Sequence, residues 1–499
     1  MNKEEALKFY QDYNEKCNAY RLALTTIEFD QYTIAPINGS DYRIRMMAFL
    51  SGELFDHQTN EEHVKKLKEM SQMDLGPIMN REIEIVLDNV NKTALLPKEF
   101  YMEMQTVFSQ GEILWRKAKK EKNYQMFKDC LKDIVRVTKQ AYTYYGKKGT
   151  LYDGMLDDYE TGMDMEKYEQ FFQIIKDRLV PFVQKVNTEG QLINDTRLHQ
   201  HFDAEKQAKV MKILQDYMGY NPDESYMGLT EHPFTSDFSL HDVRITTKYN
   251  VDSLTSSIFS IIHEYGHALY ALNVDESLEG LQVSKSMTSG IHESQSRFLE
   301  NYIGRRRSFW VQNYPKVQDI FPDQLKDISL DEFVKMINAS KRSLIRIEAD
   351  ELTYPLHILI RYELEKEMIN NDVDYDTLDT LWADKYEQYL GVRPQNASEG
   401  ILQDIHWPSG MFGYFPSYAL GSAYGAQFLQ AMKKDIDIDK ELENGHFDVI
   451  VGWLKEHIHR HGALYNGIDV LEKACHQPFD ANVYVDYLIE KYSQLHNIK

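Results

Sequence analysis

The segment 253–273 reads SLTSSIFSIIHEYGHALYALN and predicts a single amphipathic helix. Positions four apart lie on one face of a helix, because each residue turns the chain by about 100°. His263 and His267 can therefore offer two imidazole nitrogens to one metal ion, with Glu264 beside them and within reach of a bound water. Alternatively, both histidines lie on a buried face and bond to carbonyl groups. Gly266 is unfavourable in a helix interior by about 1 kcal/mol, so we expect another segment to pack closely against it.

A third metal ligand is needed, because a catalytic zinc site takes three protein ligands and keeps one position open. Glu293 is the best candidate, since it begins a second amphipathic stretch and can point across at the first helix. Its neighbour His292 competes for the same role. A structural alternative for Glu293 is a carboxylate in the first helical turn that interacts with the helix dipole.

Helical periodicity dominates the rest of the chain and predicts a mainly α protein with a small sheet. The clearest strand candidate is 242–249, which alternates and is rich in β-branched residues, and another strand is expected near 282–287. No linker, repeat or low-complexity stretch divides the chain. The predicted helical stretches are 4–30, 41–70, 79–92, 97–145, 165–187, 203–219, 252–272, 290–313, 330–370, 374–390, 417–433, 440–461 and 480–495.

Composition excludes several classes of partner. The chain has 499 residues, of which 78 are acidic and 56 basic, so its formal net charge is −22 and it repels phosphate backbones. We therefore expect no nucleic acid partner. No apolar run is long enough to span a membrane, and we find no signal peptide. The three cysteines match no disulfide or metal-binding spacing, so we expect a cytoplasmic protein.

The pairing of the HEYGH motif with HESQ at 292–295 resembles the thermostable carboxypeptidase Taq family of metallocarboxypeptidases. Other signatures of that family occur here in the same order. They are HPF at 232–234, DVRIT at 242–246, IRIEAD at 345–350, GILQDIHW at 400–407 and GYFPSY at 413–418.

The resemblance implies a fold, an activity and a set of metal ligands. The fold is a single large helical peptidase unit over residues 1–499, with a deep substrate groove and a small β-sheet lining it. Residues 1–90 supply helices over the opening, and 230–420 form the catalytic core. Members remove single residues from peptide C-termini with broad specificity and are commonly homodimers. The motif carries the metal-ligand role onto His263, His267 and Glu293, and the catalytic carboxylate role onto Glu264.

The expected mechanism follows from these roles. Zinc lowers the pKa of its bound water toward about 7, and Glu264 takes the proton from that water and delivers it to the leaving amine. The oxyanion needs a further donor, for which His406, Tyr414 and Tyr418 are candidates. The alternative for the two tyrosines is packing in the wall of the groove.

An exopeptidase must also bind the free C-terminal carboxylate, and the planar fork of an arginine does this best. Arg346 is the first candidate and Arg244 the second. Either arginine could instead form a structural ion pair, with Asp350 or Asp242 as partners. His232 could approach the metal site or serve only as a turn residue.

We therefore predict a zinc-dependent carboxypeptidase that hydrolyses the last peptide bond of short, unfolded peptides. Co²⁺ or Mn²⁺ could replace Zn²⁺ at such a ligand set. One alternative is an oligopeptidase that cleaves internally or releases dipeptides on the same site. Another is a metal-dependent scaffold that binds peptides without hydrolysing them, against which the intact Glu264 argues.

Overall fold

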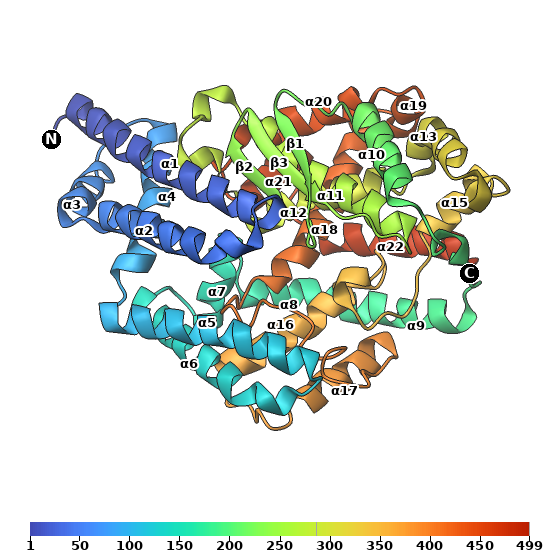
Figure 1. Cartoon of the computed structure of the whole chain (residues 1–499), viewed down its shortest axis with the longest axis horizontal. Coiled ribbons are helices and arrows are strands. Elements are labelled where there is room, and N and C mark those ends of the chain that lie inside the picture. The colour runs from blue at the N-terminus through green and yellow to red at the C-terminus, as the bar shows by residue number, and fades with distance from the viewer. Residues whose placement is uncertain (286, 499) are drawn as a thin grey trace.

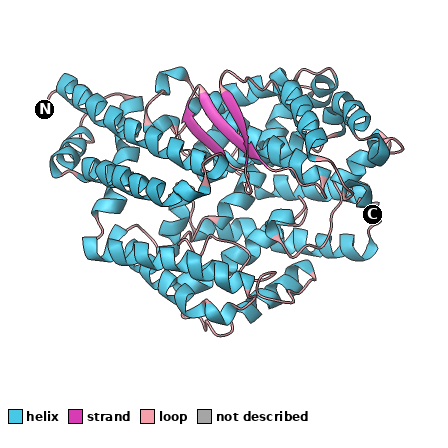
Figure 2. Cartoon of the chain, in the orientation of Figure 1, coloured by secondary structure: helices cyan, strands magenta, loops and turns pink. Residues whose placement is uncertain are grey.

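Helices dominate the chain, as the spacing of its apolar residues predicts (Figures 1 and 2). The computed structural model describes residues 1–285 and 287–498. The first helices are α1 (Lys3–Thr33), α2 (Ser40–Thr59), α3 (Glu61–Met70), α4 (Pro77–Ala94), α5 (Lys98–Lys120), α6 (Lys128–Tyr145), α7 (Leu151–Tyr159), α8 (Met165–Ile174), α9 (Val180–Glu189) and α10 (Ala204–Met218). After the sheet come α11 (Leu254–Leu272), α12 (Ser289–Arg297), α13 (Arg307–Ile320), α14 (Pro322–Leu325), α15 (Leu330–Ile337), α16 (Tyr354–Asn370), α17 (Leu378–Leu390), α18 (Phe415–Asp435), α19 (Ile438–Glu443), α20 (Phe447–His457), α21 (Gly467–Cys475) and α22 (Ala481–His496).

Short polar side chains end some helices earlier than the apolar spacing predicts. The predicted helix 41–70 breaks at Asn60, whose side chain accepts hydrogen bonds from the backbone N–H groups of Glu62 at 3.0 Å and His63 at 3.2 Å. It thereby caps α3. The predicted helix 97–145 breaks between α5 and α6, where Asn123 caps a short 3₁₀ turn. In both cases the apolar stripe continues, but a local side-chain bond replaces the helical backbone bond.

The sheet has three strands, β1 (Ser225–Leu229), β2 (Thr235–Ser239) and β3 (Asp242–Thr247). β3 lies in the middle, parallel to β1 and antiparallel to β2. The strand predicted at 242–249 is therefore confirmed. The strand expected near 282–287 is wrong: Gln282–Ser284 is a 3₁₀ turn, and Ser286 lies outside the described residues. There the backbone N–H groups of Gln282 and Val283 bond to a buried carboxylate instead of to another strand.

Glycines allow α11, α12 and α18 to approach closely at the centre of the molecule. A Cβ atom on Gly266 of α11 would lie 2.6 Å from the carbonyl oxygen of Gln295 in α12, which confirms that another segment packs against Gly266. A Cβ on Gly421 of α18 would lie 2.9 Å from the Cβ of Glu293. Side chains larger than glycine would push these helices apart. The three helices therefore form a tight stack around the predicted metal ligands.

Helices α1 to α4 pack around a hydrophobic cluster of their own and lie along one side of the remainder (Figure 1). Two of the contacts that join them to it are made by the buried side chains of Phe29 and Glu82. Phe29 of α1 packs edge-on against Phe234 and Phe238 of β2 and its preceding loop, at ring distances of 5.8 and 5.9 Å. Glu82 of α4 accepts the backbone N–H groups of residues 282 and 283 at 2.8 and 2.9 Å. That residues 1–90 cover the substrate opening, and that the chain forms one domain, stay predictions. Among the described residues, no helix is both long and apolar enough to cross a membrane.

Candidate metal centre and active site

The structure brings His263, His267 and Glu293 together. One ligand atom from each lies within 4.8 Å of the other two. The Oε2 atom of Glu293 is 3.9 Å from Nε2 of His263 and 3.6 Å from Nε2 of His267. Ligands about 2.1 Å from a tetrahedral zinc are separated from one another by roughly 3.4 Å. The three side chains therefore fit a small tetrahedral metal ion with little movement.

Each histidine is oriented through its other ring nitrogen. Nδ1 of His263 lies 3.0 Å from Oε2 of Glu300, a residue in the π-helical turn Phe298–Ile303 that follows α12. Nδ1 of His267 lies 2.6 Å from Nδ1 of His292. Both contacts leave Nε2 free for the metal, as is usual for zinc-bound histidines. His292 therefore lies on the far side of His267, where it does not compete with Glu293 as third ligand.

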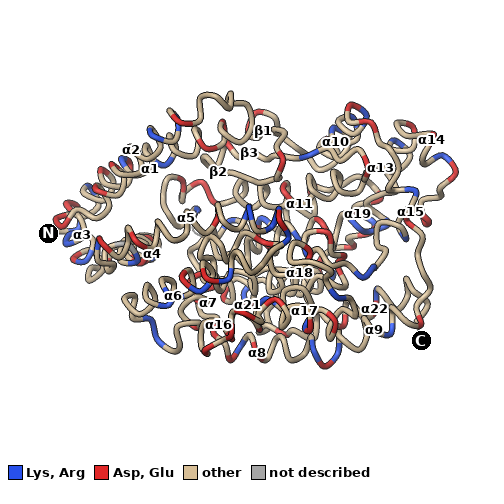
Figure 3. Tube along the Cα trace, turned by 60° about the horizontal axis from the view of Figure 1, so that its bottom comes forward, with Lys and Arg blue, Asp and Glu red and all other residues tan. Residues whose placement is uncertain are grey.

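Arg297 orients the Glu293 carboxylate. Its Nε donates to Oε1 of Glu293 at 2.7 Å, and one terminal nitrogen donates to Glu300 at 3.0 Å. The guanidinium also lies over the ring of Tyr354, 4.3 Å from its centroid. Oε2 of Glu293 then faces the two histidines. Charged residues of both signs occur along the chain near α11 and α18, at the centre of the molecule (Figure 3).

Glu264 is held by the sheet. It is 7% exposed, and its Oε2 accepts a hydrogen bond of 2.6 Å from the hydroxyl of Thr235 on β2. Burial raises the pKa of Glu264 above its ordinary value, while the Thr235 bond opposes that rise. Oε1 of Glu264 makes no hydrogen bond to any described residue, so it is available to accept a proton.

The three predicted oxyanion donors also lie together. Nε2 of His406 is 3.3 Å from the Tyr418 hydroxyl, and the rings of Tyr414 and Tyr418 meet edge to face at 5.1 Å. Burial lowers the pKa of His406 to about 3, helped by the positive charges of Arg346 and Arg361. His406 is therefore a neutral imidazole near pH 7, which can donate one hydrogen bond without carrying charge.

Arg346 forms an ion pair, as the alternative to carboxylate binding predicted, but its partner is Asp404 and not Asp350. Its Nε donates to Oδ1 of Asp404 at 3.0 Å, and NH1 donates to the Tyr354 hydroxyl at 3.1 Å. Asp350 instead accepts the backbone N–H of Lys341 at 3.0 Å. The other carboxylate oxygen of Asp404 accepts from Arg361 at 2.7 Å. One buried aspartate thus lies between two buried arginines.

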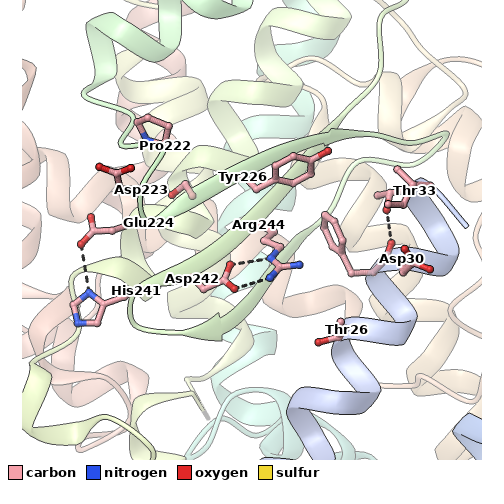
Figure 4. Close-up of a pocket in the computed structure, with 13 residues that line it drawn as sticks. Thr26, Asp30, Thr33, Pro222, Asp223, Glu224, Tyr226, His241, Asp242 and Arg244 are labelled. Carbon is pink, nitrogen blue, oxygen red and sulfur yellow. Dashed lines mark hydrogen bonds and ion pairs between the residues drawn. The ribbon is translucent and has the colours of Figure 1, made fainter.

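Arg244 and His232 lie apart from this cluster. Arg244 pairs with Asp242 through two bonds of 2.8 and 2.7 Å (Figure 4). Its guanidinium also stacks on Phe238, 3.9 Å from the ring centroid. It lines a cavity of about 600 Å³ between α1 and the sheet. His232 is exposed in the loop between β1 and β2. Within the described part of the chain, neither side chain bonds to His263, His267 or Glu293.

Glu160 fixes the start of α12, the helix that carries Glu293. This carboxyl follows α7, is fully buried, and accepts the backbone N–H of Gly290 at 2.8 Å. Burial raises its pKa from 4.5 to about 7. The folded chain therefore binds a proton at Glu160 more tightly than the unfolded chain does, so protonation of this carboxyl stabilises the fold. Its contribution to stability is complete below about pH 4.5 and is lost as the pH rises through 7.

We expect Glu160→Gln to remove this pH dependence. Between pH 4.5 and 8, the free energy of unfolding of the native chain should fall by about 3 kcal/mol more than that of the variant. Denaturant unfolding of both proteins at each pH, with the same metal content, measures the difference. Other titrating groups cancel in the comparison. Parallel curves for the two proteins would show that Glu160 keeps its ordinary pKa.

Comparison with known proteins agrees with this geometry. A family model described as Carboxypeptidase Taq (M32) metallopeptidase matches residues 9–492. The chain belongs to this family. It is 38% identical over 496 residues to Carboxypeptidase 1 of Bacillus subtilis, covering 98% of each chain. It is 35% identical over 450 residues to Thermostable carboxypeptidase 1 of Pyrococcus furiosus, covering 89% of each. A solved P. furiosus carboxypeptidase structure superposes with a TM-score of 0.94 at 31% identity, covering 99% of both chains.

Membership of the M32 family confirms two of the predictions. The fold is mainly helical with a small sheet, like that of the family's solved structures. The protein is a metallocarboxypeptidase, an enzyme that acts with a divalent metal.

Sequence reasoning missed the residues that support the site, namely Thr235, His292 as a partner of His267, Arg297, Glu300 and Asp404. A signal existed for two of them. Arg297 and Glu300 lie four and seven positions after Glu293, on the same helical face, so that opposite charges at this spacing predict an ion-pair network. Thr235 follows the HPF motif directly, but nothing in its neighbourhood predicts contact with Glu264.

Proposed function

We propose that this M32 enzyme uses Zn²⁺ to hydrolyse the last peptide bond of short, unfolded peptides with broad specificity. The observation that carries the proposal is the cluster of His263, His267 and Glu293 beside a buried, correctly held Glu264. Two imidazoles and one carboxylate suit zinc, and Co²⁺ or Mn²⁺ could replace it. The family resemblance also supports a homodimer, which sedimentation velocity would test.

Glu264 is proposed as the general base and acid. Zinc, when bound by the three ligands, lowers the pKa of a water and polarises the scissile carbonyl. Thr235 occupies Oε2 of Glu264, which leaves Oε1 to take the proton from the attacking water. The same oxygen then delivers that proton to the leaving amine. Because Glu264 is buried and bonded on one side, little reorganisation is needed for either transfer.

His406, Tyr414 and Tyr418 are proposed to stabilise the oxyanion. His406 is neutral near pH 7, so its N–H donates as a dipole and does not compete for protons with Glu264. Tyr418 bonds to His406 and packs on Tyr414, which couples the three groups.

Arg346 is proposed to bind the C-terminal carboxylate, with Arg244 and His232 as weaker candidates. Asp404 neutralises only one of its two arginine partners, so the group formed by Arg346, Asp404 and Arg361 has a net positive charge. A guanidinium has five N–H donors. In Arg346, Asp404 takes one N–H donor on Nε and one on NH2, and the Tyr354 hydroxyl takes one on NH1. Two N–H donors of Arg346 are therefore left to bind a carboxylate. Arg244 is already held bidentately by Asp242.

The decisive experiment compares one blocked peptide as free acid and as C-terminal amide. We expect stepwise loss of single residues from the free acid only, read by mass spectrometry. Arg346→Lys should raise KM for the free acid by about 10- to 100-fold, because lysine keeps the charge but loses the bidentate fork. Arg361→Lys is the matched control and should leave KM for the free acid unchanged, since Arg361 also bonds to Asp404 but is fully buried. Internal cleavage of both peptides, or release of dipeptides, would replace the proposal with an oligopeptidase.

A further inference from the structure

Helix α16 holds both ends of the loop that carries the proposed oxyanion donors. Arg361 and Glu365 lie one turn apart on this helix, and both are fully buried. Arg361 binds the beginning of the loop, because its Nε donates to Asp404 at 2.7 Å and NH2 donates to Gln403 at 3.1 Å. Glu365 binds the loop further along. None of the motifs that resemble the family contains Glu365.

The Glu365 carboxylate accepts three hydrogen bonds. Its Oε1 accepts from Nε1 of Trp407 at 2.7 Å. Its Oε2 accepts from the backbone N–H of Gly413 at 2.9 Å and from the hydroxyl of Tyr152 on α7 at 2.8 Å. Trp407 follows His406 directly, and Gly413 precedes Tyr414. One buried carboxylate thus fixes the residues next to two of the proposed oxyanion donors.

We propose that Glu365 is a positioning residue, which sets His406 and Tyr414 in the active site by holding the loop 404–414 through Trp407 and Gly413. The inference rests on the proposed function, in which those two side chains stabilise the oxyanion. Glu365 contacts neither the metal ligands nor Glu264 through any bond in the described chain. It acts on the reaction only through the loop.

The partners of residue 365 require an acceptor oxygen on each side of its side chain. The indole N–H of Trp407 and the backbone N–H of Gly413 can only donate, so both need an acceptor. A glutamine at 365 offers one oxygen and one NH₂ group, so that either Trp407 or Gly413 would face another donor. A buried donor without an acceptor is unfavourable, and the loop would shift to relieve it. Glutamine is otherwise nearly the same size as glutamate, so packing is kept.

The loop has little room for such a shift at Gly413. This residue has a φ of +86°, which favours glycine, and a Cβ there would lie 2.6 Å from the carbonyl oxygen of Met155 in α7. The backbone is therefore already in contact with α7 on one side. A change at Glu365 must then move the loop away from α7, which displaces Tyr414 and His406 together.

The first test is Glu365→Gln, with Glu363→Gln as the matched control. Glu363 lies on the same helix, is 7% exposed and bonds to Lys385 at 2.6 Å and Tyr389 at 2.9 Å, away from the loop. We expect Glu365→Gln to lower kcat by about 10- to 100-fold, the effect of a displacement near 1 Å, with little change in KM or metal content. Glu363→Gln should lower Tm without lowering kcat. Equal kcat values for the two variants would overturn the proposal.

A double-mutant cycle separates positioning from a general loss of stability. In a background that carries both His406→Ala and Tyr414→Phe, Glu365→Gln should lower kcat by less than threefold, because both of the side chains that it positions are already altered. Fully multiplicative effects would contradict action through the loop. If Glu365→Gln fails to fold, Trp407→Phe removes the other partner of the same bond and should give the same signature, with a fall in kcat and an unchanged KM.

Amide hydrogen exchange tests whether Glu365 holds the loop 404–414, and it does not depend on enzyme activity. Exchange of the 404–414 backbone amides should be faster in Glu365→Gln than in the native protein, and unchanged in Glu363→Gln. Unchanged exchange in both variants would overturn the proposal even if the enzyme is active. Conversely, an inactive native protein would refute the proposed function, while the exchange result would still decide whether Glu365 holds the loop.

Discussion

Glu264→Gln is expected to lower kcat by about 10³- to 10⁴-fold while the protein keeps its metal ion. Glutamine preserves the size of the side chain and can still accept the 2.6 Å bond from Thr235. It cannot take a proton from the attacking water or return it to the leaving amine. Because Glu264 is not among the three clustered ligands, metal affinity should not change.

Two measurements check this prediction. Metal content by mass spectrometry should match that of the native enzyme, and kcat on a free-acid peptide gives the loss. Thr235→Val is a graded control, since it removes the hydroxyl that orients Glu264 but leaves the carboxylate, and should cost about tenfold. If Glu264→Gln retained more than a tenth of the native kcat, another group would have to be the base.

The clustering of the three candidate metal ligands was predictable from sequence because their geometry is largely local. His263 and His267 share a face through helical spacing alone, and Glu293 begins the next helix that can face them. The same local logic predicts that Gly266 has a close neighbour, which proved to be the backbone of α12. The residues alone left His292 open as a competitor, because adjacent residues on a helix point about 100° apart and the facing direction is not written in the sequence, and only the family resemblance favoured Glu293.

The supporting contacts of Arg346 and Thr235 were not predictable, because they join distant segments. The alternative role of Arg346, an ion pair, was assigned to the nearby Asp350, but Arg346 pairs with Asp404, 58 residues further along the chain. Thr235 reaches Glu264 from a strand, 29 residues before it. A single sequence carries no signal for such pairs. Local side-chain bonds were also underestimated, as at Asn60, where an apolar stripe that spans two helices suggested one.

Removal of the metal should abolish activity and lower stability together. Dialysis against a chelator is expected to reduce kcat/KM to background, with full recovery on adding one equivalent of Zn²⁺. His263 and His267 lie on α11 and Glu293 lies on α12, so the three ligands come together only in the folded chain, and the metal binds the folded chain alone. At a free metal concentration 1,000-fold above its Kd, this stabilises the fold by about 4 kcal/mol. Thermal unfolding with and without chelator measures that shift.

Glu300→Gln should give a partial form of this effect, since Glu300 reaches the metal ligands indirectly, through His263 and through Arg297, which bonds to Glu293. Its carboxylate lies 3.0 Å from Nδ1 of His263 and accepts from Arg297 at the same distance. Loss of its charge should weaken metal affinity by about 10- to 100-fold, the usual effect of a group that orients a zinc-bound histidine. Competition with a fluorescent zinc chelator measures the affinity, and Glu363→Gln serves as a buried carboxylate control away from the site. If Glu300→Gln bound zinc with native affinity, His263 would be oriented by its helix alone. In the chelation experiment, full activity without metal would remove the metal from the proposed mechanism.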